Sequence, residues 1–358
     1  MAQKDGQNYA PRAANAQPVC QKGDFRFSVV GLTHGHIYGM TQNLLDAGGE
    51  VVGVFDPDPA KVEKFRQAFP AVQSADCEER ILDDAGIQMI ATADIPAFRG
   101  PLGLRVLGAG KHFFTDKAPF TTLKQLAEAR RKVEQTGLLW AVCYTERLQS
   151  EAAGYAEQLI ASGAIGRVVQ VIGLGPHRVN APTREPYFFK IEEYGGILCD
   201  VGSHQVEQFL FFAGCKDAEV VHSKVANFHH PDHPGLEDFG DANLLGDNGA
   251  SNYFRVDWLT PEGLSTWGDG RTFILGTEGY IELRKYVDVA REATADHVYW
   301  VDAEGEHYFN AAGQVGFPYF GRLILDVLSG TRNAMPQEHA FKAAELALQA
   351  QAHAIRVK

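Results

Sequence analysis

The sequence has few of the features that mark membrane, nucleic-acid-binding or disulfide-rich proteins. Among its 358 residues no apolar run approaches the roughly 20 residues that a transmembrane helix needs. The formal net charge of -12 comes without a cluster of lysine and arginine, so nucleic acid and anionic membrane surfaces are disfavoured as partners. The 5 cysteines are widely spaced and form no C-x-x-C pair, which fits reduced thiols. Residues 1–23 lack the apolar stretch of a signal peptide, so we expect a flexible tail over residues 1–24 and a cytoplasmic location.

The first third of the chain alternates β-rich runs with helical stretches. Strands are expected at residues 27–32, 51–56, 88–92, 111–115 and 138–144, with amphipathic helices between them. This alternation indicates right-handed βαβ crossovers and a parallel sheet. We therefore expect an α/β fold whose residues 25–145 form a doubly wound Rossmann domain.

A different pattern begins near residue 146. After a helix at 150–162, runs rich in β-branched residues predict strands at 168–174, 219–227, 243–245, 252–259, 272–275, 281–283 and 297–301. Few helices separate them, so residues 146–358 are expected to form an α+β domain on an open, mostly antiparallel sheet. Two helices, 318–328 and 338–357, close the chain, and the last of them could pack back on the Rossmann domain.

The segment from Val29 to His36 has the position of a Rossmann phosphate loop, after the first strand and before the first helix. Free N–H groups and the helix dipole attract a pyrophosphate at such a place. Only Gly31 matches the motif G-x-G-x-x-G, because Thr33 and His36 replace its other glycines and Gly35 comes one residue early. A plain tight turn would look the same, so both interpretations stay open.

Asp56 strengthens the cofactor interpretation. It ends the second strand, where an acidic side chain accepts hydrogen bonds from the ribose hydroxyls of NAD. A carboxylate there repels a 2′-phosphate, which favours NAD over NADP. The alternative role, a cap for the helix that begins at Pro59, suits Asp58 better.

Lys117 and the pair Asp200 and His204 are the candidate catalytic residues. Lys117 follows the expected strand at 111–115 at the carboxyl edge of the sheet, where a lysine could orient a substrate hydroxyl; a solvated surface charge is the alternative. Asp200 and His204 are four residues apart and would share one face of a helix. Histidine suits the role of proton acceptor in alcohol oxidation, but a capped helix start with a core histidine remains open.

In combination these segments resemble the Gfo/Idh/MocA family of oxidoreductases from about residue 25 to the C-terminus. The motifs that carry the resemblance are Val29–His36, Asp56, Asp94-Ile95-Pro96, Gly108–His112, Asp116-Lys117, Ser162–Val168, Gly195–His204 and Gly276–Leu283.

The resemblance assigns roles to residues. Lys117 matches the lysine of the family's Glu-Lys-Pro motif, Asp200 its substrate-contacting aspartate and His204 its catalytic histidine. The expected NAD-binding residues are Gly31, Thr33, His34, Gly35, His36, Asp56, Thr92, Asp94, Pro96 and Asp116. The resemblance also implies a homodimer or homotetramer, formed through the outer face of the second domain's sheet.

This chain departs from the family pattern in two places. The phosphate loop lacks two glycines, so Thr33, His34 and His36 side chains are expected to contact the pyrophosphate. The lysine motif reads Asp-Lys-Ala-Pro, which shifts its proline by one residue. Lys117 and His204 are both retained.

Several other residues allow more than one interpretation. Tyr144 and His177 are candidates for lining a substrate pocket, or they are packed structural residues. Arg147 is a pocket residue or a surface charge. His229, His230 and His233 lie in a proline-containing loop without the cysteine or helical histidine pair that would complete a metal site, so we expect no metal.

Three functions are consistent with these residues. The favoured one is an NAD(P)-dependent dehydrogenase that moves a hydride between nicotinamide and a secondary alcohol of a sugar, inositol or related polyol. A redox-neutral lyase or glycosidase with tightly bound NAD is the second. A cofactor-sensing protein without turnover is the third, although a sensor has no need of His204 as a proton acceptor.

Overall fold

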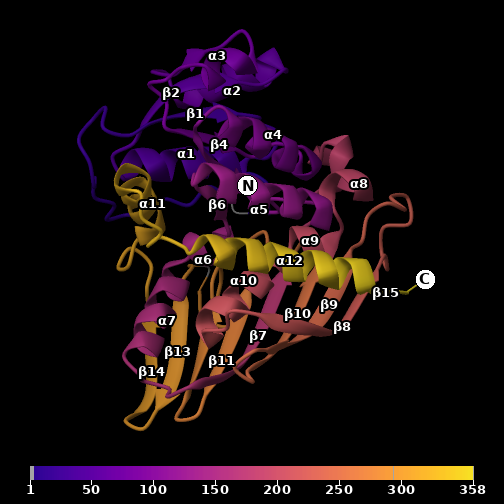
Figure 1. Ribbon diagram of the computed structural model, residues 1–358. Helices are drawn as coiled ribbons and strands as arrows, with labels where there is room; N and C mark the ends of the chain where they lie inside the picture. The colour runs from indigo at the N-terminus through magenta and orange to yellow at the C-terminus, as the bar shows by residue number, and fades with distance from the viewer. Residues whose placement is uncertain (1–3, 293, 358) are drawn as a thin grey trace. The chain divides into compact units, whose positions relative to one another are not determined.

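The parallel sheet expected near the N-terminus is present (Figure 1). The computed structural model describes residues 4–292 and 294–357. Its first sheet is formed by β1 (Arg26–Val30), β2 (Glu50–Phe55), β3 (Gln73–Ser74), β4 (Met89–Thr92), β5 (His112–Asp116) and β6 (Trp140–Cys143). The order β3-β2-β1-β4-β5-β6, all parallel, is that of the doubly wound Rossmann fold. The chain reverses direction across the sheet between β1 and β4, which makes this the switch point of the fold.

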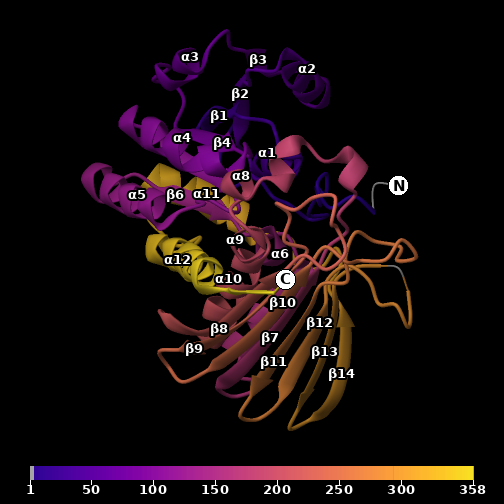
Figure 2. The same cartoon turned by 90° about the vertical axis from the view of Figure 1, so that its right-hand side faces the viewer.

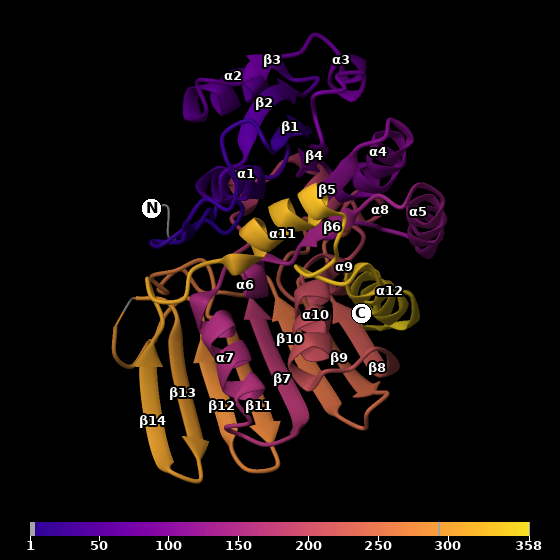
Figure 3. The same cartoon turned by 60° about the vertical axis from the view of Figure 1, so that its left-hand side comes forward.

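Helices cover both faces of this sheet. They are α1 (His36–Asp46), α2 (Pro59–Ala68), α3 (Glu78–Leu82), α4 (Pro96–Gly108), α5 (Leu123–Thr136) and α11 (Pro318–Ser329). Figure 3 shows α1 and α11 on one side of the strands and α4 and α5 on the other. The Asp58 carboxylate accepts a hydrogen bond from Ala60 N at 2.9 Å, so Asp58 caps α2 as the sequence predicts.

A late segment of the chain completes the Rossmann unit. This unit comprises Gln7–Cys143 and Phe317–Phe341, whereas the second unit contains the described residues 4–6, 144–316 and 342–357. The Gln337 side chain accepts a hydrogen bond from Trp140 N at 2.9 Å and donates one to Trp140 O at 2.8 Å. An amide side chain thereby takes the place of a further strand beside β6.

The expected tail also makes contacts in this unit. Val19 N donates to Ala47 O at 2.9 Å, and the Asn43 amide donates to Pro11 O at 3.1 Å. Arg12 forms a two-pronged ion pair with Asp46, at 2.6 and 3.0 Å. Residues 11–19 therefore run along α1, which the sequence does not predict because their polar composition carries no periodic pattern.

The second unit contains a mixed sheet of nine strands. In the order β14-β13-β12-β11-β7-β10-β9-β8-β15 all neighbours are antiparallel except β7 with β10 and β8 with β15. The strands are β7 (Val168–Pro176), β8 (Ala218–Ala226), β9 (Phe239–Gly246), β10 (Ser251–Asp257), β11 (Arg271–Gly276), β12 (Tyr280–Arg284), β13 (His297–Asp302), β14 (Gly305–Asn310) and β15 (Ile355–Val357). The prediction of one helix to Val357 is wrong: α12 (Gln337–His353) ends earlier, because residues 355–357 pair with β8.

The two faces of this sheet differ. α7 (Glu151–Ala161) and α10 (Gly202–Ala213) lie on one face (Figure 3). On strands of the open sheet seen in Figure 2, Leu275 and Tyr280 are 45% and 49% exposed, whereas Ile274 and Ile281 beside them are buried. Along β11 and β12 buried side chains thus alternate with more exposed ones, and the outer side chains are apolar where Leu275 pairs with Tyr280.

Short helices connect the strands near the ends of the sheet. They are α6 (Thr145–Leu148), α8 (Ile191–Tyr194), α9 (Ile197–Asp200) and two 3₁₀ turns, Ala181–Thr183 and Pro186–Phe189. Within the described part of the chain, no helix is both long and apolar enough to cross a membrane.

Candidate cofactor and catalytic sites

The loops after β1 and β4 meet at the switch point. His34 N donates to Ala93 O at 2.7 Å, and the Thr33 hydroxyl donates to the Asp94 carboxylate at 2.9 Å. Ligands of open α/β sheets bind at this carboxyl edge. Gly31, Thr33 and His34 of the first loop thus lie next to Asp94 of the second, as expected of residues at one edge of the sheet.

Gly31 has no room for a side chain, because neighbouring atoms occupy the space that a Cβ would need. Its φ of +84° favours glycine, and an added Cβ would lie 2.6 Å from Asp94 Cβ and 3.0 Å from Thr92 Oγ1. Gly35, at the start of α1, is equally close to the chain, because its Cβ would lie 2.3 Å from Asn8 Oδ1. Pro96 opens α4 beside this loop. A turn held this close to its neighbours, with a helix N-terminus behind it, fits a dinucleotide pyrophosphate.

Asp56 organises the same loop. One carboxylate oxygen accepts a hydrogen bond from Leu32 N at 2.7 Å, and the other accepts one from Asp58 N at 2.9 Å. Burial raises the pKa of Asp56, and these two backbone bonds partly oppose that rise. Each carboxylate oxygen retains acceptor capacity, so the contacts are compatible with ribose binding.

His36 and Asp116 connect the start of α1 to the end of β5. His36 Nδ1 lies 3.2 Å from both oxygens of Asp116, and Arg99 Nη2 lies 3.6 Å from one of them. Burial alone would raise the pKa of Asp116, but attraction by His36 and Arg99 outweighs it and lowers the pKa below its usual range. His34 completes the group, and its burial lowers its pKa well below the ordinary value.

These three side chains have the separation of metal ligands. One ligand atom each from His34, His36 and Asp116 lie within 4.8 Å of one another. The carboxylate is already engaged by His36 and by the permanent cation of Arg99, and a divalent ion would add charge of the same sign as Arg99. The observed contacts therefore account for the cluster as a tie between the loop and β5.

Lys117 follows Asp116 and is almost completely buried, with 5% of its surface exposed. Arg99 donates to the main-chain oxygens of Lys117 and of Ala118. The Lys117–Ala118 peptide bond is cis, one residue before the shifted proline. A solvated surface lysine, the alternative for Lys117, does not describe this position.

Asp200 and His204 do not share one regular helix, so that part of the prediction is wrong. α9 ends at Asp200 and α10 begins at Gly202. His204 N bonds Val201 O at 3.2 Å, a tighter turn than that of an α-helix. Both side chains are buried, at 8% and 1% exposure.

His204 lies among residues that follow β6. Its Nε2 is 3.4 Å from the Thr145 hydroxyl, and its ring meets the buried Tyr144 ring edge-on at 6.3 Å between centroids. Tyr144 is therefore a neighbour of the candidate base. Thr145 is a contact that the sequence does not single out.

His177 comes directly after β7 in an aromatic surround. Its ring centroid is 5.2 Å from that of Trp258 and 4.6 Å from that of Trp267. Its Nδ1 is 3.1 Å from Gly175 O, and its Nε2 is 4.0 Å from a carboxylate oxygen of Glu146. The geometry directs Nε2 toward this acid.

Glu146 belongs to a buried polar cluster that sequence reasoning missed. Its Oε2 accepts from Gln205 at 2.8 Å and from Lys285 at 2.9 Å. Lys285 also donates to Gln208 Oε1 at 2.8 Å. Nothing in one sequence marks Glu146 and Lys285 as partners, because 139 positions separate them and only the fold brings them together.

Arg147 is not the surface charge that one of its two interpretations expects. Its guanidinium donates to Glu207 at 2.8 and 2.9 Å and lies 3.7 Å over the Phe211 ring. With 9% of its side chain exposed, Arg147 joins α6 to α10 as a buried ion pair.

Asp238 organises the histidine-rich loop. It accepts hydrogen bonds from Phe228 N at 2.8 Å and His229 N at 2.7 Å, and it pairs with His230 Nδ1 at 2.9 Å. His233 stacks on Phe189 with 3.8 Å between ring centroids. The histidines thus have structural partners.

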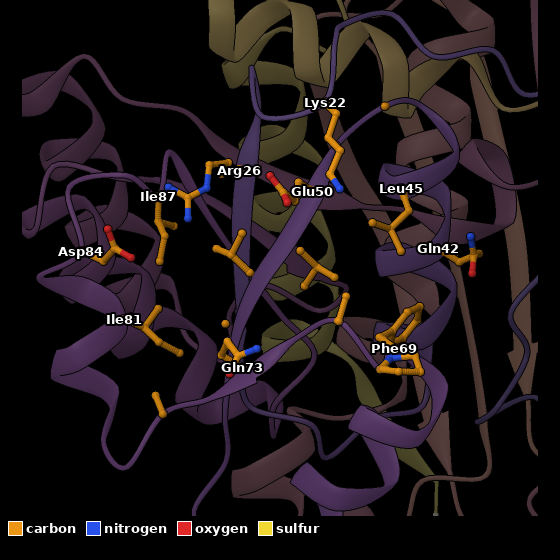
Figure 4. A pocket seen from close by; sticks show the side chains of 18 of the residues that line it. Lys22, Arg26, Gln42, Leu45, Glu50, Phe69, Gln73, Ile81, Asp84 and Ile87 are labelled. Carbon is orange, nitrogen blue, oxygen red and sulfur yellow. The ribbon is translucent and has the colours of Figure 1, made fainter.

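A large cavity lies elsewhere on the Rossmann unit. Its volume is about 1020 Å³, and Arg26 and Glu50, which begin β1 and β2, lie in its wall (Figure 4). The lining contains none of the predicted cofactor-binding residues. Because strands β1 and β2 run from this edge toward Gly31 and Asp56, the cavity is at the opposite end of the strands from the phosphate loop.

Two family models match the chain. A model described as "Oxidoreductase family, NAD-binding Rossmann fold" matches residues 25–144. A model described as "GFO/IDH/MocA C-terminal domain" matches residues 154–282.

Individual relatives agree with these matches. A crystal structure of a protein from Erwinia carotovora atroseptica is 51% identical and covers 93% of this chain and 100% of its own, with a TM-score of 0.91. The scyllo-inositol 2-dehydrogenase (NAD(+)) of Bacillus subtilis is 25% identical over 252 residues, which are 68% of this chain and 69% of that enzyme. Levoglucosan dehydrogenase, solved with NADH and levoglucosan, is 15% identical over 92% of this chain and 96% of its own; its TM-score of 0.75 indicates a shared fold.

Proposed function

Because the chain belongs to the Gfo/Idh/MocA family of oxidoreductases, we propose that it oxidises a secondary alcohol of a sugar, inositol or related polyol with NAD. The observation that carries the proposal is the buried His204 in the second unit, beside Thr145 and Tyr144. A histidine that accepts a proton is what alcohol oxidation requires of the protein.

Each candidate residue has a chemical role in this reaction. His204 accepts the proton of the reacting hydroxyl, Lys117 orients that hydroxyl, and Asp200 binds a neighbouring hydroxyl. Bound NAD supplies the ring that accepts the hydride. The loop from Gly31 to His36 and the carboxylates of Asp56 and Asp94 hold the dinucleotide, with Thr92, Pro96 and Asp116 fixing the surrounding backbone.

NAD is the proposed cofactor in preference to NADP. The Asp56 carboxylate at the end of β2 favours ribose hydroxyls over a 2′-phosphate. Lys61, whose Nζ lies 3.3 Å from Thr33 Oγ1, is the cation near this position that could weaken the preference. Parallel titrations with NAD and NADP test it.

The deciding experiment follows NADH production by absorbance across sugars, inositols and sugar acids. Turnover with NAD that falls at least about 100-fold in both Lys117→Ala and His204→Ala supports the dehydrogenase. Asp288→Asn, on a loop after β12, serves as a control that should retain activity. Turnover that survives both substitutions contradicts the assigned roles.

The redox-neutral alternative makes a different prediction. A lyase or glycosidase with tightly held NAD consumes substrate, detected by product chromatography, without net NADH. A protein that binds NAD but converts none of the panel would be a cofactor sensor.

We also propose a homodimer or homotetramer formed through the outer face of the nine-stranded sheet. Ile172, Phe273, Leu275 and Tyr280 border a shallow hollow on that face. Leu275→Glu should reduce the mass measured by light scattering and leave NAD binding intact; an unchanged mass contradicts this interface.

A cytoplasmic location is proposed as well. All 5 cysteines are free thiols, which suits a reducing compartment. Fractionation of the source cells tests it.

A further inference from the structure

We propose that Glu146 is a positioning residue for the proton acceptor: its ionised carboxylate favours the protonated state of His204. This inference rests on the proposed function, in which His204 takes a proton from the substrate. It concerns a group that has no role in the reaction as described above. All residues involved lie in the second unit.

The first step is that Glu146 is held rigidly and away from solvent. Its residue surface is 2% exposed, and that of its partner Lys285 is 1% exposed. Lys285 and Gln205 fix one carboxylate oxygen, Oε2, at 2.9 and 2.8 Å. Gln208, one turn of α10 after His204, accepts from Lys285 and donates to His204 O at 3.0 Å. The cluster is therefore connected to the backbone of His204.

The second step concerns the other oxygen. Among the residues that the structure describes, Glu146 Oε1 has no hydrogen-bond partner although it is fully buried. The His177 Nε2 is 4.0 Å from it. A buried carboxylate oxygen without a hydrogen bond is costly, so its orientation toward the His177 imidazole calls for an explanation.

Electrostatic attraction explains the orientation of the Glu146 carboxylate. Burial would raise the pKa of Glu146, but attraction by Lys285, His204 and His177 outweighs it and lowers the pKa to about 2. Such attraction is mutual. An ionised Glu146 therefore stabilises the imidazolium that His204 becomes when it accepts a proton.

The remaining ionisable groups around the cluster come from several elements. Lys285 follows β12, His177 follows β7, and His204 lies on α10. Asp200 at the end of α9 and Tyr144 before α6 flank His204, and Arg147 and Glu207 neutralise each other. Attraction by His204 and His177 contributes to the lowered pKa of Glu146.

A second buried acid in the same unit, paired with the partly exposed Arg284, provides a control. Asp288 is 1% exposed and pairs with Arg284 at 2.7 Å, and its pKa is also lowered to about 2. Burial is opposed there by Tyr299, Ala290 and Arg284, with no histidine among these groups. Asp288→Asn removes a charge whose lowered pKa owes nothing to a histidine among the groups that shift it.

The test follows the titration of His204 directly by NMR. The full chain is labelled with ¹⁵N-histidine, and the His204 ring signal is assigned by its absence from His204→Gln. Titration from about pH 5 to 9 then gives a midpoint for the wild type, Glu146→Gln, Glu146→Asp and Asp288→Asn. The measurement needs neither substrate nor turnover.

Glu146→Gln should lower the midpoint by about 1 pH unit, because a nearby opposite charge shifts a pKa by one unit or more. Glu146→Asp keeps the charge and should restore most of the midpoint, and Asp288→Asn should leave it unchanged. A midpoint that stays constant in Glu146→Gln, or falls equally in Asp288→Asn, overturns the proposal. If Glu146→Gln does not fold, the double variant Glu146→Gln/Lys285→Gln is compared with Lys285→Gln, which keeps the acid, and the midpoint should be lower in the double variant.

The pH dependence of turnover distinguishes this inference from the proposed function. A base must be deprotonated to act, so the low-pH limb of kcat/KM should move to lower pH in Glu146→Gln along with the midpoint. Failure of the proposed function appears differently, as wild-type turnover that survives His204→Ala. In that case the effect of Glu146 on the His204 midpoint could still be measured, but it would have no role in catalysis.

Discussion

Each unit of the molecule contains a buried carboxylate that faces two histidines and one buried cation. In the Rossmann unit the acid is Asp116, and its neighbours are His34, His36 and Arg99. In the second unit the acid is Glu146, and its neighbours are His177, His204 and Lys285. Both acids have a lowered pKa and remain ionised at neutral pH.

The two differ in how their oxygens are used. Both oxygens of Asp116 lie 3.2 Å from His36 Nδ1, so this carboxylate is fully engaged in holding α1 to β5. Glu146 commits Oε2 to Lys285 and Gln205 and leaves Oε1 facing His177. A buried carboxylate near two histidines and a cation thus holds α1 to β5 in one unit. In the other unit, by our proposal, it favours protonation of His204.

Asp116→Asn should have the largest effect on stability. Loss of the charge leaves Arg99 buried without its partner, which costs about 3 kcal/mol of unfolding free energy at pH 7. The pKa of Asp116 is lower in the folded protein than its ordinary 3.8, so its contribution is present above that pH and is lost as pH falls below it. Urea unfolding should therefore show the gap between variant and wild type shrinking toward pH 3. An equal gap at both pH values would break the comparison.

Gly31→Ala tests whether backbone shape, rather than the His36–Asp116 tie, sets cofactor binding. An alanine at φ +84° against Asp94 should strain the loop by about 2 kcal/mol and weaken NAD binding by about 30-fold in calorimetry. Gly110→Ala is the matched control, since Gly110 has φ +78° but open space around it. Equal losses of NAD affinity in both variants would contradict the close-approach argument.

Asp56→Asn addresses a carboxylate for which no histidine contributes to the pKa shift. Loss of a charged acceptor at the ribose position should weaken NAD binding about tenfold, to a similar degree at pH 6 and pH 8. NADP binding should suffer less. Asp58→Asn, which keeps a good helix cap, should change neither affinity. A strong pH dependence of the Asp56→Asn effect would show that histidines act on this site too.

Asp296→Asn should have the smallest effect, with the opposite sign. Burial raises the pKa of Asp296 to about 6, and hydrogen bonds from Ala152 N and the Ser150 hydroxyl only partly oppose it. A folded-state pKa above the ordinary 3.8 means that stability is lost as pH rises between these values. Asparagine keeps the acceptor and tolerates φ +62°, so the variant should gain up to about 1 kcal/mol at pH 8 and little at pH 4. A lower melting temperature at pH 8 would contradict this.

Local patterns allowed much of the Rossmann unit to be predicted. The strand preceding Gly31, the acid Asp56 and the cap Asp58 each follow from residues close together in the sequence. The family resemblance supplied the rest of the cofactor-binding set. Interactions across the sheet, such as that of His36 with Asp116, could not be derived because they depend on which strands become neighbours.

The second unit was less predictable for the same reason. Its strands were located, but β14 was missed and β15 was read as helix, since a 3-residue edge strand is defined by its partner β8 alone. Arg147 and Glu146 are adjacent charged residues after β6, and the sequence does not indicate that they have different partners. Only the packing of α10 and the end of β12 gives one an ion pair with Glu207 and the other a contact with Lys285.

The return of residues 317–341 to the Rossmann unit has a consequence for biosynthesis. A ribosome that has made β6 has not yet made Gln337, which pairs with both main-chain groups of Trp140. Until that segment emerges, the edge of β6 is open to pairing with another chain. A fragment ending at Cys143 would keep this exposed edge permanently, so separate production of the nucleotide-binding half calls for a linker that joins residues 7–143 directly to 317–341.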